Sequence, residues 1–330
     1  MTNASSPVIA TSFKQQLFKG ASLLLWLSLT ACTSQQGSPP SKNMVAPLHQ
    51  AIEVVLPAQM VETSALACLE DGSFLTINDS GHTPTVYQIN HQGQLLQQYE
   101  LNASNRDWEA MAIHQGQLWI ADIGNNAGKN PGGDLYQLNL PLRLGQNIVP
   151  SHSSFIYPDF PQLPLTAYQH DFDAEALVSA NGQLFLINKA WQSDHSSVYL
   201  LEPNNQAAQQ TLKTTHQARM VATISGLPGV ITDAAFSQQH QRFVLTGYAR
   251  FRDNALRLAL NNDYQPFLAV LDQHFQLQQL VPIPQSGQLE AICIDPQQQV
   301  WLTQEQSKRR PALLWRWGTM DKLLSLIDID

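Results

Sequence analysis

Acidic side chains recur in this 330-residue chain close to the start of short apolar segments. Glu109, Glu175 and Glu290 lie in such segments, Asp233 is at the matching position of a fourth, and Ser64 is at that of a fifth. A second group follows 13 to 15 residues later along the chain: Asp79, Asp122, Lys189, Tyr248 and Glu305. Crowded carboxylates repel one another unless a cation lies among them, and oxygen ligands suit Ca²⁺. The spacing predicts an acidic pocket that binds a ligand or a divalent cation.

Two interpretations of these residues stay open. In the first, Glu109, Asp122, Glu175 and Glu290 hold a metal ion, and Glu175 and Lys189 are the candidate catalytic groups of a metal-assisted hydrolase. In the second, carboxylates at the start of repeats hydrogen-bond the backbone of the next repeat and lock the fold. Both roles can coexist on different residues.

Several other kinds of site are excluded by the sequence. The ten histidines show no spacing typical of a zinc or iron site. The chain contains no P-loop, dinucleotide-binding glycine motif or nucleophile elbow. A formal net charge of −8 argues against nucleic-acid binding, which requires a basic surface.

The elements that must position these residues repeat along the chain. Five blocks of four short β-branched and aromatic segments, separated by turn residues, begin near Thr63, Asp107, Asp173, Thr232 and Leu289. This pattern predicts an all-β fold, a single β-propeller of five four-stranded blades. Six blades is the alternative, because segments 141–170 and 203–231 are long; a sandwich or a two-domain β protein is another. Residues 51–56, or else the C-terminal tail, supply the last strand, and an N-terminal strand would close the ring.

The N-terminus predicts export and anchoring. Lys14 and Lys19 precede a short apolar stretch that ends in Leu29-Thr30-Ala31-Cys32. This tetrapeptide resembles the bacterial lipobox, which implies acylation (palmitate) of Cys32 and attachment to the membrane through lipid. An ordinary signal peptide cut near Ala31 is the alternative. By analogy with lipoprotein sorting, Thr33 favours the outer membrane of the cell envelope.

The resulting domain prediction has three parts: residues 1–31 as a lipoprotein signal peptide, 32–50 as a flexible tether, and 51–330 as the propeller. Removing residues 1–31 takes away two lysines and no acid, so the net charge changes from −8 to −10. Cys68 and Cys293 remain in a compartment that permits disulfides, and two buried free thiols are favoured over a bridge. A monomer is expected.

A family resemblance adds to this interpretation. The succession N-D-S-G from Asn78, D-W-E-A-M-A from Asp107, D-I-G-N-N from Asp122 and D-A-E-A-L from Asp173 resembles secreted bacterial propellers of the phytase-like and SdiA-regulated type. The similarity extends over about residues 60–318. It implies an extracytoplasmic propeller of five or six blades, with calcium and an esterase-like or phytase-like activity in some members.

The sequence thus predicts a membrane-anchored propeller lipoprotein that binds a small molecule, a partner protein or a divalent cation in an acidic axial pocket. The alternative is a calcium-dependent hydrolase of ester or phosphoester bonds.

Overall fold

A computed structural model describes residues 52–143, 145, 148–161, 165–203, 214–249, 264–284, 287–308 and 310–326. Residues 46–330 form a compact unit separate from residues 1–45, and the description below concerns the former. The predicted signal peptide, Cys32 and the tether of residues 32–50 lie outside the described residues. Within the described ranges, no helix is long and apolar enough to cross a membrane.

The described chain is all-β apart from one short helix, α3 (Met320–Leu324). Its strands fall into consecutive antiparallel units, which we number 1 to 5. Unit 1 contains β2 (Thr63–Cys68), β3 (Phe74–Asn78), β4 (Thr85–Ile89) and β5 (Leu95–Glu100). Unit 2 contains β6 (Trp108–His114), β7 (Gln117–Asp122), β8 (Gly132–Asn139) and β9 (Ser151–Ile156).

The remaining units follow the same order. Unit 3 contains β10 (Ala174–Ala180), β11 (Gln183–Asn188), β12 (His195–Pro203) and β13 (Thr214–Ser225). Unit 4 contains β14 (Gly229–Ser237), β15 (Arg242–Ala249), β16 (Pro266–Leu271) and β17 (Leu277–Pro282). Unit 5 contains β18 (Leu289–Ile294), β19 (Gln299–Gln304), β20 (Leu313–Thr319) and, from the other end of the domain, β1 (Ile52–Val55).

These strands form four hydrogen-bonded sheets rather than one sheet for each unit. Units 1, 4 and 5 are separate four-stranded sheets. Units 2 and 3 share an eight-stranded sheet, because β13 runs parallel to β9 and pairs with it from Thr214↔Ser153 to Gln217↔Ile156.

Burial differs systematically between the inner and outer strands of a unit. Every residue of β3 and of β16 is buried, as expected for strands covered on both faces. The last strands β5 and β17 instead carry mostly exposed or partly exposed side chains. The apolar runs of the sequence therefore correspond to inner strands, which the outer strands shield from solvent.

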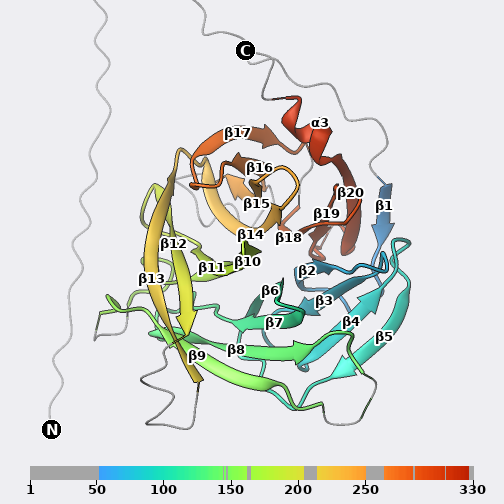
Figure 1. Ribbon diagram of the computed structural model, residues 1–330, viewed down its shortest axis with the longest axis horizontal. Helices are drawn as coiled ribbons and strands as arrows, with labels where there is room; N and C mark the ends of the chain where they lie inside the picture. Colours follow the sequence, from blue (N-terminus) through green and yellow to red (C-terminus); the bar gives the residue numbers. More distant parts are fainter. Residues whose placement is uncertain are drawn as a thin grey trace, which may run out of the picture. The chain divides into compact units, whose positions relative to one another are not determined.

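The first strands of the units surround a common centre (Figure 1). Each of β2, β6, β10 and β14 packs beside the first strand of the next unit, and β18 packs beside β2. Small buried residues allow this close approach, among them Ala65, Ala110, Ala176 and Ala291. The arrangement is that of a β-propeller-like fold, and it brings equivalent residues of different units to the same end of the first strands.

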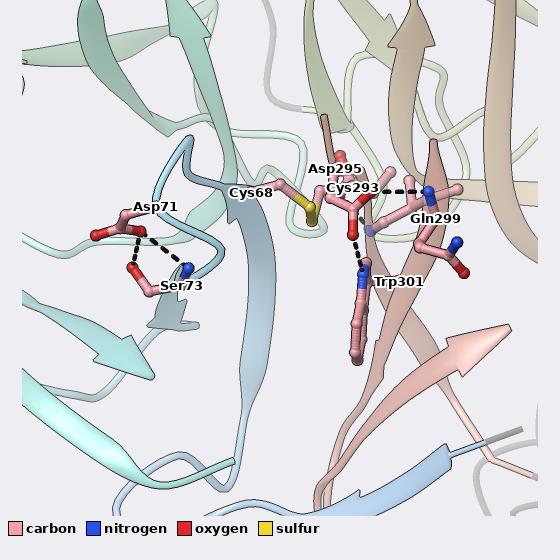
Figure 2. Close-up of a disulfide and its surroundings, with 9 residues drawn as sticks. Cys68, Asp71, Ser73, Cys293, Asp295, Gln299 and Trp301 are labelled. Atoms are coloured by element: carbon pink, nitrogen blue, oxygen red, sulfur yellow. Dashed lines mark hydrogen bonds between the residues drawn. A yellow bond between two sulfur atoms is a disulfide. The ribbon is translucent and has the colours of Figure 1, made fainter. Parts of the chain in front are cut away.

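Two features join unit 5 to the start of the domain. β1 pairs antiparallel with β20, from Ile52↔Arg316 to Val55↔Leu313, whereas the residues after β20 form α3. A disulfide joins Cys68 in β2 to Cys293 in β18 (Figure 2). The expectation of two free thiols was wrong, because the adjacency of β2 and β18 brings the Cα atoms of these cysteines to 5.7 Å, within bridging distance.

Candidate functional site: a carboxylate-rich mouth at one end of the first strands

A one-residue bulge occurs near the start of the first strand in every unit. In unit 2, Trp108 pairs with Asp122 and Ala110 with Ala121, so that Glu109 has no opposite residue. A bulge re-aims the side chain of the extra residue out of the regular alternation. The equivalent positions, which we call the bulge row, are Ser64, Glu109, Glu175, Thr232 and Glu290.

A second set of residues, the hairpin row, follows the second strand of each unit or lies near its end: Asp79, Ile123, Lys189, Tyr248 and Glu305. The backbone of these residues pairs with the residues two positions before the bulge, the entry row: Glu62, Asp107, Asp173, Val230 and Gln288. Since the three rows lie at the same end of the first strands, they bring together acidic residues from four units.

Asp79, Asp107 and Glu109 form the tightest acidic cluster, which we call the trio. One carboxylate oxygen from each lies within 4.8 Å of the others. Burial and the neighbouring charge of Asp79 raise the pKa of Asp107 to about 7. Burial, followed by the charge of Glu175, raises the pKa of Glu109 well above its usual value. The trio therefore brings three carboxyl groups together at a place where their negative charges are poorly compensated by the protein.

Gly124 leaves room for the trio. A Cβ atom at this position would lie 2.2 Å from Asp107 Oδ2 and 2.6 Å from Glu109 Oε1. Two carboxylates thus lie directly against the backbone of residue 124, and any larger residue there would displace them. The D-I-G segment of the sequence forms part of the acidic mouth through its glycine.

Lys189 is the cation of this mouth, and it is buried against Glu175. Its Nζ lies 2.7 Å from Glu175 Oε1, and the two side chains are 6% and 4% exposed. The same Nζ lies 5.2 Å from the ring centre of Trp191 and 5.5 Å from that of Tyr248. Burial opposes the charge, but the carboxylate of Glu175 and the aromatic rings stabilise it, and the pKa of Lys189 is raised.

Glu290 and Glu305 add two carboxyl groups from unit 5. Burial raises the pKa of Glu290 to about 7, and that of Glu305 is raised by burial and by the charge of Glu290. Glu290 Oε1 is buried with no hydrogen-bond partner among the described residues. Tyr264 packs against Tyr248 with ring centres 4.9 Å apart, and its hydroxyl interacts electrostatically with both glutamates.

The structure does not bring Asp122 to this mouth, so its inclusion among the metal ligands requires correction. Asp122 pairs with Trp108 and is one position before the hairpin row, where Ile123 stands. Its oxygens accept hydrogen bonds from the backbone N–H groups of Arg106 and Asp107 and contact the Arg106 guanidinium at 3.2 Å. Asn188, at the corresponding position of unit 3, holds the segment before β10 by a bond of the opposite direction, in which its Nδ2 donates to Asp171 O. Asp122 is a structural residue that fixes the approach to β6.

Asp233 also needs correction, because the bulge of unit 4 falls at Thr232. Asp233 therefore occupies the position of Ala65, Ala110, Ala176 and Ala291 in the other units. Its Oδ2 accepts a 2.9 Å hydrogen bond from the backbone N–H of Ile292 in unit 5. This carboxylate locks two units together, which is the second of the two interpretations made from the sequence.

The hydroxyl residues of the bulge row have the same locking role. Ser64 Oγ donates to Trp108 O at 2.8 Å, and Thr232 Oγ1 donates to Leu289 O at 2.7 Å. Each accepting carbonyl belongs to the residue just before the bulge glutamate of the next unit. The bulge row thus divides into two locking hydroxyls and three glutamates.

Asp107 and Tyr264 were absent from the residues predicted for the site. For Asp107 the sequence contains a signal, since Asp107-Trp108-Glu109 and Asp173-Ala174-Glu175 share an acid two residues before the glutamate. Tyr264 has no counterpart in the repeat, and only the pairing of Tyr248 with Pro266 brings it near the mouth.

The opposite ends of the first strands border a different kind of opening. A cavity of about 150 Å³ is lined there by residues of all five first strands, including Met111, Phe236 and the disulfide cysteines. Its lining residues carry no carboxylate. The trio, Glu175 and Glu290 lie instead at the end at which the first strands begin.

Comparisons with known proteins identify no relative in sequence. No family description matches the chain, and no curated protein matches it. Among solved structures, a protein of unknown function from Bacteroides caccae is 12% identical, with a TM-score of 0.37 over 70% of this chain and 86% of that one. A chain of the mitotic checkpoint complex is 11% identical, with a TM-score of 0.40 over 89% of this chain and 98% of that one. The resemblance to phytase-like and SdiA-regulated propellers stays a prediction.

Proposed function

We propose that this protein is a single five-bladed β-propeller whose acidic mouth binds one divalent cation, Ca²⁺ by preference. Each unit is one blade, and β1 completes the fifth and closes the ring. The trio of Asp79, Asp107 and Glu109 carries the proposal, since three carboxylate oxygens within 4.8 Å of one another match the separation of ligands around a Ca²⁺ ion.

The chemistry of the trio fits a hard cation. Ca²⁺ takes six to eight oxygen ligands at about 2.3–2.6 Å, and carboxylates with water can complete such a shell. The Gly124 cradle is a second, independent support, because it keeps two of the three carboxylates together at a position where a side chain would separate them. Burial and then repulsion between carboxylates raise the pKa of Asp107 and Glu109, and a bound cation would offset both effects.

Calcium titration of the full chain by calorimetry tests this function. We expect one binding site per chain and a higher melting temperature in calcium than in chelator, since a ligand that binds only the folded state stabilises it. Asp79→Asn should weaken binding by at least tenfold. Asp122→Asn is the matched control, because Asp122 lies outside the trio. The proposal is wrong if the chain gives no binding heat and no thermal shift at millimolar calcium.

A calcium-dependent esterase or phosphoesterase is the second candidate. The observation that favours it is the position of Lys189, whose charge acts on Glu109 and so lies near the trio. The positive charge of Lys189 would attract an anionic group held at the cation and would help to stabilise negative charge that develops there. Turnover of chromogenic acetate and phosphate esters, measured with and without calcium, separates the two candidates. Calcium-dependent turnover supports the hydrolase, and calcium binding without turnover supports a binding protein that is not a hydrolase of these esters.

We also propose that the chain is an outer-membrane lipoprotein anchored through Cys32. The support is the lipobox-like Leu29-Thr30-Ala31-Cys32, together with a disulfide compatible with an oxidising compartment. Cys32→Ala should move the protein from the membrane fraction to the soluble periplasmic fraction. Unchanged fractionation would contradict the anchoring.

A further inference from the structure

Lys189 holds a position at which a cation is surrounded by acidic and aromatic groups. Its side chain is 6% exposed, and a buried ammonium group is unfavourable unless it is paired. Its nearest partner is Glu175, which belongs to the bulge row like Glu109 and Glu290. The charge of Glu290 also acts on the ammonium. Lys189 therefore compensates carboxylates that no other described cation neutralises.

The surroundings of Lys189 hold it in this place. Its backbone N–H donates to Asp173 O at 2.8 Å, and Trp191 Nε1 donates to Asp173 Oδ2 at 2.7 Å. The Trp191 ring thereby keeps a fixed orientation toward Nζ, with Tyr248 as a second ring. A side chain fixed by its neighbours in this way has a defined charge position rather than a mobile one.

Asp79 stands at the equivalent position of unit 1, in the hairpin row. There the residue is a carboxylate that joins Glu109 in the trio, whereas in unit 3 it is an ammonium that pairs with Glu175. We propose that Lys189 takes the place of a second cation, and so limits the mouth to one divalent ion. The charges of Glu175 and Glu290 act on each other and on Lys189, and Glu290 has an unpartnered buried oxygen. These two carboxylates are the ligands that this second ion would use. The inference rests on the proposed calcium site.

Removing the ammonium while keeping the carboxylates tests the inference. Lys189→Met keeps much of the side-chain volume and leaves Glu175 uncompensated. We expect calorimetric titration with calcium chloride to give two sites per chain in this variant, against one in the wild type. We also expect calcium to raise its melting temperature by more than that of the wild type. Lys189→Arg, which keeps the charge, should stay at one site.

A double variant distinguishes cation binding from a general loosening of the mouth. Lys189→Met combined with Glu175→Gln lacks both the ammonium and its carboxylate partner and should return to one site. One site in Lys189→Met, with the thermal shift of the wild type, would overturn the inference. If Lys189→Met is unfolded in chelator, recovery of the folded protein in calcium supports it, and absence of recovery contradicts it. Failure of the proposed function has a different result, namely a wild type that binds no calcium.

Discussion

Cys68 and Cys293 are covalently joined although 225 residues separate them in sequence. Each lies in the first strand of its unit, and these units are the first and the last of the domain. The same junction is held by β1, which comes from before unit 1 and completes the sheet of unit 5. The disulfide and the strand β1 therefore make two independent connections across one junction.

Breaking this disulfide should lower stability. A cross-link over such a long loop restricts the unfolded chain, and removal of native disulfides costs roughly 2–5 kcal/mol. We expect the Cys68→Ser, Cys293→Ser double variant to unfold at a lower urea concentration than the oxidised wild type. Reductant should lower the urea midpoint of the wild type to that of the variant, and it should leave the midpoint of the variant unchanged. Equal midpoints for the oxidised wild type and the variant would contradict a stabilising role.

Substitution of Asp122 should lower stability without lowering calcium affinity, whereas substitution of Asp79 should lower calcium affinity. Asp122→Ala leaves the N–H groups of Arg106 and Asp107 without their acceptor, and we expect a loss of about 1–3 kcal/mol in unfolding free energy. The calcium affinity of the folded variant should stay near that of the wild type. Urea denaturation in chelator and calcium titration provide the two measurements. A large loss of calcium affinity with full stability would return Asp122 to the ligand set.

The hydroxyls of Ser64 and Thr232 should contribute to stability in the same way. Thr232→Ala removes the hydroxyl that donates to the buried carbonyl of Leu289, at a cost of about 1–3 kcal/mol. Thr232→Ser keeps the hydroxyl and is the matched control; Ser64→Ala tests the equivalent bond to Trp108. We expect both alanine variants to unfold at lower denaturant concentration than the serine control. If Thr232→Ala unfolds at the same denaturant concentration as the wild type, the Thr232 hydroxyl does not lock unit 4 to unit 5.

Two buried histidines should make units 2 and 3 sensitive to acid. The rings of His114 and His216 lie 5.9 and 5.6 Å from the ring of Trp119 and also contact Ser179 and Ser153. Burial lowers the pKa of both below 6.5. The neutral form therefore stabilises the folded state above about pH 6.5, and this stability is lost as the pH falls, because the unfolded chain takes up the protons first.

The measurement is the melting temperature between pH 7.5 and pH 5. We expect the decrease toward acid to be smaller in the His114→Gln, His216→Gln double variant than in the wild type. The difference between the two slopes isolates the histidines from the carboxylates that titrate in the same range. If the melting temperatures of the two proteins fall in parallel as the pH decreases, His114 and His216 are not the source of the acid sensitivity.

Much of the candidate site could be predicted from the repeat. Glu109, Glu175, Lys189 and Glu290 are recognisable because each unit repeats a local pattern of apolar segment, turn and acidic residue. The strand and turn preferences behind that pattern act over a few residues, so that they are visible without tertiary structure.

The errors at Asp122 and Asp233 have one physical cause. Side chains alternate in direction along a strand, so an alignment that is wrong by a single residue assigns the opposite face. Asp122 and Asp233 are each one residue away from the positions that face the mouth, which are Ile123 and Thr232, and nothing in the local composition marks this difference. Only hydrogen bonding between strands decides which acid faces the mouth and which bonds a backbone N–H group.

The sequence by itself therefore determined the all-β class, the order of the strands and most of the residues that gather at the mouth. The tertiary structure decided the disulfide, the pairing of Lys189 with Glu175 and the composition of the trio. The disulfide joins the first and last units, the trio joins units 1 and 2, and Lys189 meets Glu175 within unit 3. The geometry of all three contacts depends on how the strands pair and pack against one another. Local preferences cannot encode such distances, because they exist only once the first strands are assembled.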